Sequence, residues 1–369
     1  MTEAPDPVGS HQIGYCERMA EAQVKGHPGL PWTIRLFESI PLAPIWIGLL
    51  ITALGLSVFL VYAYLMGWIE GARLHGDPFW ESVQFWFELV QVAMIGYAPT
   101  FASYWLRGAV RDLHDLRPAL RCSDAEFQAE LRELTGFERR PLLIAILIGI
   151  AIGVGTTINP GGWSPHRPPL GDPLLTWSII RSGLQFALIA HALYTSVAVT
   201  RRLSRTGERR AQVDLLDLTS LMPFARSGLR GALLVMGWIV LASLSLVAPW
   251  ARGIAIGGLW VVLGLFVAAL LGPVVGVHRR IREEKRMELE RVRAAIRRES
   301  GLRMESRGEW QPVDAHLSDL IVYKGLIESI NTWLLDLPVL LKFSLIVLLG
   351  VGSWLGQAFV ERLLSVFID

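Results

Sequence analysis

Residues 174–200 of the chain, LLTWSIIRSGLQFALIAHALYTSVAVT, decide its fold class. As an α-helix this run would rise about 40 Å, which exceeds the roughly 30 Å of hydrocarbon in a bilayer. Two ionisable side chains, Arg181 and His191, interrupt the apolar run. An ionisable group inside a membrane span is costly unless it faces the interior of a helix bundle and finds a partner there. The stretch therefore predicts a transmembrane helix surrounded by other helices.

The composition of the whole chain agrees with a membrane protein. Of its 369 residues, 52% are hydrophobic and 18% are charged, and the mean hydropathy is +0.42. Soluble domains carry about 25% charged residues, and the apolar residues here gather in runs of about 20. Tryptophan, which favours the headgroup layer, occurs at the edges of several runs. These tryptophans are Trp32, Trp68, Trp80, Trp163, Trp177 and Trp250.

Seven runs are long and apolar enough to cross a bilayer. They are residues 44–67, 82–106, 142–159, 174–200, 229–249, 255–277 and 338–359. The second run is the least regular, because Gln84, Glu88 and Gln91 interrupt it. The expected fold is an all-α integral membrane protein, a seven-transmembrane-helix bundle in which 174–200 is the central span.

Lysine and arginine alternate in number from one connecting segment to the next. Three precede the first span, seven lie in 107–140, seven in 201–230 and twelve in 278–337, whereas the other loops and the C-terminal tail hold one each. Basic residues accumulate on the cytoplasmic side of membrane proteins. The bias predicts a cytoplasmic N-terminus, an exterior C-terminus and a multi-pass protein of a bacterial-type plasma (inner) membrane.

This topology divides the chain into four parts. Residues 1–43 form a cytoplasmic segment with an interfacial helix, and 44–277 hold six spans with cytoplasmic loops at 107–140 and 201–228. Residues 278–337 form a cytoplasmic charged helix, a loop and an amphipathic helix. Residues 338–369 contain the seventh span and a short exterior tail.

Several local patterns predict helices on the cytoplasmic side. Ser123 and Glu126 form a capping box that starts a short helix over 124–135. Apolar spacing predicts further helices, which are residues 32–42, 213–221, a charged continuation of the sixth span, and 317–334 after a loop at 299–314. The charged continuation is interpreted as a solvated helix; the alternatives are contact with another subunit and contact with anionic lipid.

A polar layer is expected between the second and fourth spans. Both spans run from outside to inside, and Glu88 and Arg181 both lie about 10 Å below the outer edge. Gln91 and Gln185 follow them one turn deeper. A structural Glu88–Arg181 ion pair is one interpretation. A substrate, ion or proton site built on the same layer is the other.

His191 lies near the middle of the fourth span. A neutral histidine hydrogen-bonded to a neighbouring helix is the favoured interpretation of this residue. A proton relay is the alternative, because histidine changes its charge near physiological pH.

Small residues recur every four positions in three of the spans. Such spacing lets helix backbones approach closely where lipid supplies no hydrophobic drive. These residues are Ala145, Gly149 and Gly153; Gly264, Ala268, Gly272 and Gly276; and Gly352 and Gly356. Packing within one chain is the first interpretation, and a homo-oligomer formed through one of these faces is the second.

Motifs for most kinds of chemistry are missing from the sequence. It contains no phosphate-binding Gly-rich loop, no His-Glu-x-x-His zinc helix and no Gly-x-Ser-x-Gly or kinase signature. Cys16 and Cys122 are too few and too far apart for a metal site, and on the cytoplasmic side they stay reduced. Basic residues in 278–307 alternate with glutamates, which disfavours nucleic-acid binding. We therefore expect no enzyme activity, no metal and no cofactor.

The sequence leaves two functions to be weighed. The first is a transporter- or channel-like membrane protein that uses the polar layer of the second and fourth spans. The second is a membrane sensor or scaffold that binds a cytoplasmic protein partner through residues 278–335. The lipid bilayer is a partner in either case.

Overall fold

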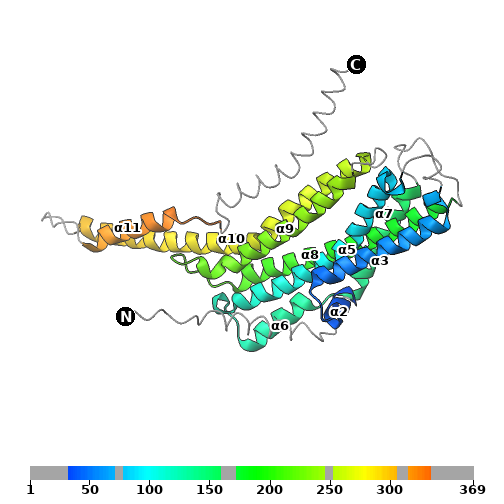
Figure 1. Ribbon diagram of the computed structural model, residues 1–369. Coiled ribbons are helices and arrows are strands. Elements are labelled where there is room, and N and C mark those ends of the chain that lie inside the picture. Colours follow the sequence, from blue (N-terminus) through cyan, green and yellow to red (C-terminus); the bar gives the residue numbers. More distant parts are fainter. Residues whose placement is uncertain (1–31, 71–77, 159–171, 246–251, 306–314, 334–369) are drawn as a thin grey trace, which may run out of the picture.

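The computed structural model describes residues 32–70, 78–158, 172–245, 252–305 and 315–333, and these are helical and joined by short connections (Figure 1). The helices are α2 (Trp32–Ser39), α3 (Pro44–Leu65), α5 (Val83–Asp115), α6 (Asp124–Thr135), α7 (Arg139–Ile158), α8 (Pro173–Arg210), α9 (Met222–Leu244), α10 (Arg252–Glu305) and α11 (Ala315–Ser329). Three short 3-10 turns accompany them, η1 (Phe79–Glu81), η2 (Arg117–Ala119) and η3 (Thr219–Leu221). Within the described ranges there is no β-strand, only a single bridge between Leu120 and Ala211.

Among the residues that the structure describes, five helical segments are long and apolar enough to cross a membrane. They are Pro44–Leu65, Asp124–Ile158, Pro173–Arg210, Thr219–Leu244 and Leu263–Ser300. Helix α5 covers the predicted second span but is not among the five, because Gln84, Glu88 and Gln91 and its charged C-terminal turns lower its hydropathy. The predicted seventh span, 338–359, with Gly352 and Gly356, lies outside the described residues. An all-helical chain with five such segments has the make-up of a multi-pass membrane protein.

Helix α8 lies at the centre of the helix contacts. It packs against α5, α6, α7 and α10, while α3 and α9 both pack against α5. In Figure 1 the long helices run side by side, and α10 continues beyond the bundle as an arm along which α11 folds back. Residues 174–200, which were predicted to form the central span, therefore lie in a helix that packs against the long helices α5, α7 and α10.

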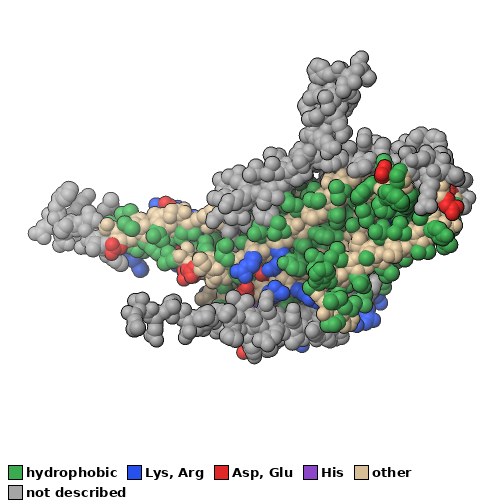
Figure 2. Space-filling view, in the orientation of Figure 1, with side chains coloured by type: hydrophobic (Ala, Val, Ile, Leu, Met, Phe, Trp, Pro, Cys, Tyr) green, Lys and Arg blue, Asp and Glu red, His purple; other side chains and the backbone are tan. Residues whose placement is uncertain are grey.

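The two outermost long helices have little buried surface. In both α3 and the apolar part of α7, only 17% of the residues in the most apolar window are buried, against 44% in α8. Large apolar side chains on their outer sides are exposed, and hydrophobic side chains cover much of the face shown in Figure 2. Extended exposed apolar surfaces mark contact with a membrane or another protein. These helices therefore form two layers: α5 and α8 lie inside and are more buried, whereas α3 and α7 lie outside and expose apolar side chains.

Glycines set the contact between α7 and α8. A Cβ atom at Gly149 would overlap the backbone carbonyl of Phe186, and one at Gly153 would overlap that of Ser182. The structure thus places the small residues of the predicted third span directly against α8, with Ala145 half-buried one turn earlier. This is the close backbone approach that small residues at four-residue spacing permit.

The four small residues of α10 do not share one contact. Gly272 lies against Thr200 and Gly276 against the carbonyl of Ser204, both on α8. Gly264 and Ala268 are exposed within the described part of the chain. The reason is geometric: four residues turn a helix by about 400°, so each step drifts by about 40° around the axis. The expectation that all four form a single packing face is corrected accordingly.

The predicted helix over 213–221 is wrong apart from its last turn. Asp214 accepts a hydrogen bond from the Leu216 backbone N–H, and Asp217 accepts one from the Thr219 N–H, at 2.9 and 3.0 Å. Such side-chain bonds to the backbone compete with helix formation. The bonds from Thr219 also hold the pKa of the Asp217 carboxyl below its ordinary value. The segment is a connection that ends in η3.

The other predicted soluble helices are present with shifted ends. The capping box at Ser123 and Glu126 starts α6 as expected. Helix α10 runs on to Glu305, so the expected loop begins later than residue 299. Helix α11 ends at Ser329, five residues before the predicted end.

Glycine contacts on α7 give a direct test of this packing. We expect Gly153→Ala to lower the free energy of unfolding by about 1–3 kcal/mol, because the new Cβ would overlap the α8 backbone. Gly155→Ala is the matched control in the same helix, since a Cβ there meets nothing within 4 Å. The control should be neutral or stabilising by up to about 1 kcal/mol. Unfolding by SDS titration measures both, and equal effects would contradict the packing.

Candidate functional site

A buried ion pair joins α5 to α8. The Arg181 Nε atom lies 2.9 Å from Oε2 of Glu88, and the two side chains are 6% and 0% exposed. Sequence reasoning placed these residues at the same depth in neighbouring spans, and the structure brings them into contact. The Nε–H bond does not point along this line, so the contact is an attraction of charges rather than an aligned hydrogen bond.

The remaining contacts of Arg181 come from two directions. Its Nη1 donates to Oε1 of Gln185, one turn along α8, at 3.3 Å. Its guanidinium carbon lies 5.5 Å from the centre of the Phe87 ring on α5. A guanidinium over an aromatic face gains electrostatic attraction, and more so when water is excluded. Arg181 is thus held by a carboxylate, an amide and a ring.

Both oxygens of Glu88 accept hydrogen bonds from neutral donors. The Trp177 indole Nε1 donates to Oε2 at 3.0 Å, and the Gln84 Nε2 donates to Oε1 at 3.0 Å. Each donor lies one helical turn before a charged residue, Trp177 before Arg181 and Gln84 before Glu88. That i, i+4 spacing was visible in the sequence and is the signal that could have identified both residues as members of the site.

The two deeper amides diverge instead of forming one layer. Gln185 donates to the Met94 sulfur at 3.4 Å, which keeps it in the ion-pair cluster. Gln91 donates to the Ser245 hydroxyl at the end of α9, at 3.0 Å. Gln185 therefore lies in the same cluster as Glu88 and Arg181, whereas Gln91 connects α5 to α9. No sequence pattern indicated Met94 or Ser245.

An aromatic wall covers the Trp177 side of the cluster. The Trp177 ring lies 5.6 Å from that of Phe59 and 5.5 Å from that of Tyr62, both on α3. The Tyr62 hydroxyl donates to the Pro173 carbonyl at the start of α8, at 2.7 Å. Helices α3, α5 and α8 therefore meet at this end of the bundle, and their rings separate the carboxylate from solvent.

His191 lies elsewhere on α8. It is 1% exposed, and ten residues of helix place it about 15 Å from Arg181. Its backbone carbonyl accepts a hydrogen bond from the Thr195 hydroxyl at 3.0 Å. The structure does not bring His191 into the ion-pair cluster, so it is not part of the same site.

A second ion pair fastens the opposite end of α5. Arg230 of α9 donates from both terminal nitrogens to Asp112, at 2.7 and 3.2 Å. Asp112 is 1% exposed, and Gly108 leaves the room in which the Arg230 side chain lies. Two-point guanidinium–carboxylate contacts fix orientation as well as distance. Twenty-four residues of helix, about 36 Å, separate Glu88 from Asp112.

The polar groups around Glu88 define what chemistry this site can support. Among the residues that the structure describes, no group of three or more His, Cys, Asp or Glu side chains is placed to hold a metal ion. The cluster offers one carboxylate, one guanidinium, amide groups and an indole N–H. These groups can exchange a proton or contact an ion or a small polar solute.

The chain matches no protein-family model, no curated protein and no solved structure.

Removing one charge of the buried pair tests how much the pair contributes to the free energy of unfolding. We expect Arg181→Ala to lower the free energy of unfolding by about 3–5 kcal/mol, because Glu88 is left buried without a compensating charge. The double variant Glu88→Gln/Arg181→Ala removes both charges and should recover about 2 kcal/mol or more of that loss. SDS titration of the single and double variants gives the coupling. Additive effects would show that the two side chains do not interact.

Proposed function

We propose that the protein is a transporter- or channel-like membrane protein whose polar centre is the Glu88–Arg181 pair. The observation that carries the proposal is a fully buried carboxylate beside a guanidinium, between two long helices. Ionisable residues in membrane segments are rare and mark ion, proton or substrate pathways. The amides and the indole that complete the cluster are groups that can contact a passing ion or polar solute.

The proposed topology places this centre below the outer surface. Basic residues concentrate at 107–140, 201–230 and 278–337, which supports a cytoplasmic N-terminus in a bacterial-type plasma membrane. A seventh span at 338–359 belongs to the same proposal. In this orientation the aromatic wall of α3 and α8 lies between Glu88 and the exterior.

The described conformation corresponds to a closed state in this mechanism. Glu88 is completely buried, and Trp177 both donates to it and packs against Phe59 and Tyr62. Passage of an ion or solute therefore requires the indole–carboxylate bond to break and the Trp177 ring to leave the wall.

Flux through reconstituted protein tests the proposal. In proteoliposomes, we expect wild-type flux of at least one of H⁺, K⁺, Cl⁻, glycerol and urea above that of protein-free vesicles. Glu88→Gln should reduce it about tenfold or more, because the amide keeps the shape but loses the charge. Glu81→Gln is the matched control, an exposed glutamate on η1 outside the cluster. Entrapped indicators measure ion flux, and stopped-flow light scattering measures solute flux.

Two outcomes of the flux measurement would contradict the proposal. One is the absence of flux for all five probes in folded wild-type protein. The other is flux in Glu88→Gln equal to that of wild type and of Glu81→Gln, which would leave the pair as a structural brace alone.

A second candidate function rests on the arm formed by α10 and α11. One stretch of α11 carries three exposed apolar side chains, Ile321, Val322 and Leu326, at 54%, 67% and 47% exposure. Neighbouring exposed apolar side chains of this kind mark interaction surfaces more often than single ones do. A sensor or scaffold that binds a protein partner through the arm is therefore the alternative.

Charge introduced on α11 tests this alternative. If the arm docks a partner, Val322→Glu should abolish co-purification of that partner, because a carboxylate would be buried at the apolar contact. Gln128→Glu, which adds the same charge at an exposed position of α6 outside the arm, should retain it. Quantitative mass spectrometry of the purified protein compares the two. Equal retention by both variants would contradict docking at this face.

A further inference from the structure

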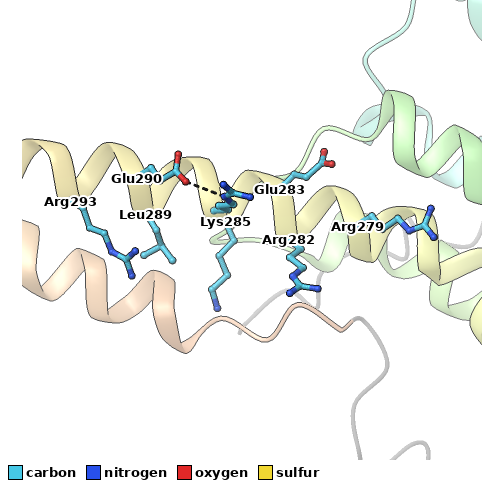
Figure 3. A pocket seen from close by; sticks show the side chains of 8 residues that line it. Arg279, Arg282, Glu283, Lys285, Leu289, Glu290 and Arg293 are labelled. Carbon is cyan, nitrogen blue, oxygen red and sulfur yellow. Dashed lines mark hydrogen bonds and ion pairs between the residues drawn. The ribbon is translucent and has the colours of Figure 1, made fainter.

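A basic groove runs along α10 just beyond the end of its apolar part. It encloses about 570 Å³ and is open on one side. The described residues that line it are Arg279, Arg282, Glu283, Lys285, Arg286, Leu289, Glu290 and Arg293. Figure 3 shows Arg282 and Lys285 pointing toward the segment that follows α11, and Leu289 and Arg293 pointing toward α11 itself. The groove therefore lies along the junction of the two helices of the arm.

The lining has more positive than negative charge. Five cationic side chains face two carboxylates, an excess of three positive charges. Lys285 donates to two backbone carbonyls, those of Glu328 and Ile330, at 2.9 and 2.8 Å, so its charge holds the end of α11 but meets no carboxylate there. The charges of the described lining residues are thus not balanced among themselves.

The arginines of the groove differ in their partners. Arg286 pairs with Glu290 at 3.0 Å, Arg293 with Glu328 at 3.4 Å, and Arg279 only distantly with Glu208, at 3.8 Å. Arg282 is exposed and forms no ion pair with any residue in the described ranges. It follows Arg279 by three positions and precedes Arg286 by four, so the three lie on one side of α10.

Along the axis of α10, the groove begins just beyond the end of the apolar run, at the level expected for lipid headgroups. The apolar run of α10 ends at Val277, and a rise of 1.5 Å per residue places Arg279 and Arg282 about 3 and 8 Å beyond it. The polar layer on each side of the hydrocarbon is about 5–8 Å thick. Arg279 and Arg282 are therefore level with lipid headgroups if this run spans the bilayer, while Arg286 and Arg293 lie farther out.

From the charge, the partners and the height we propose that this groove binds a phosphate group, with Arg282 as its principal contact. Guanidinium groups recognise phosphate through two parallel N–H···O bonds, and Arg279 and Arg286 supply further positive charge on either side. Leu289 gives the groove an apolar side that can contact the ester substituent. The phosphate belongs either to the headgroup of an anionic lipid or to a soluble phosphate ester. This binding site is independent of the Glu88–Arg181 centre.

Lipid retention and ligand binding test the proposal on the full-length protein. In nanodiscs of equal phosphatidylglycerol and phosphatidylcholine, native mass spectrometry should find phosphatidylglycerol retained in excess. Titration of the detergent-solubilised protein with glycerol 3-phosphate tests the soluble source. Arg282→Gln should weaken whichever binding is seen about tenfold, the effect of losing one charge-assisted contact. Arg297→Gln, an exposed arginine of α10 outside the groove, is the matched control and should bind as wild type does.

Each outcome of these experiments decides the proposal. Selective retention of phosphatidylglycerol that depends on Arg282 assigns the groove to lipid, and saturable glycerol 3-phosphate binding that depends on Arg282 assigns it to a soluble ester. Equal losses in Arg282→Gln and Arg297→Gln would reveal general charge attraction and overturn the proposal. Absence of both kinds of binding in wild-type protein would overturn it as well.

Discussion

Glu88 and Arg181 are a pair of opposite charges with almost no access to water, and the inner helices are arranged around this constraint. Desolvating two ions costs several kcal/mol each, and only close contact together with further hydrogen bonds offsets that cost. Trp177, Gln84 and Gln185 supply those bonds. Helix α3 then contributes the rings that enclose Trp177. Residues of α3, α5 and α8 thus all contribute to the surroundings of one buried ion pair.

Helix α5 is held near both of its ends by charges. Glu88 joins it to α8 and Asp112 joins it to α9, about 36 Å apart along the helix. Between these points its buried side chains are mostly apolar and include Ala98, Phe101 and Trp105, while Gln91 and Tyr97 add hydrogen bonds to Ser245 and to the Leu234 carbonyl. The two ion pairs limit sliding of α5 against its neighbours, since a shift of one turn would separate both pairs. An opening motion at the Trp177 end is compatible with the Asp112 end staying fixed.

Much of the membrane-helix pattern could be predicted from the sequence, because apolar runs of about 20 residues have few alternatives. The contact of Glu88 with Arg181 could be predicted because both residues lie at the same depth in neighbouring spans. Depth follows from counting residues along the sequence and needs no knowledge of how the helices are rotated. The partner choice of Gln91 and the exposure of Gly264 could not be predicted in this way. Both depend on rotation about the helix axis and on which helix lies next to it.

The soluble segments show the same division between local and spatial information. The capping box of α6 is local and was predicted from two residues, Ser123 and Glu126. The apolar spacing of 213–221 suggested a helix, but Asp214 and Asp217 bond to the backbone nearby and break it. The basic groove of α10 also escaped prediction, because its charges alternate with glutamates along the chain. Only the pairing in space shows that Arg282 forms no ion pair with another of the described residues.

Water access to the ion-pair cluster is the most direct test of the central claim that Glu88 and Arg181 form a working polar centre. Met94→Cys places a thiol beside Gln185 in a protein whose Cys16 and Cys122 are replaced by serine. Reaction with a membrane-impermeant thiol reagent is then followed from each side of proteoliposomes under flux conditions, with Ser318→Cys as an exposed positive control. We predict modification of Met94→Cys from at least one side. A thiol that stays unmodified from both sides, while the control reacts, would contradict the account.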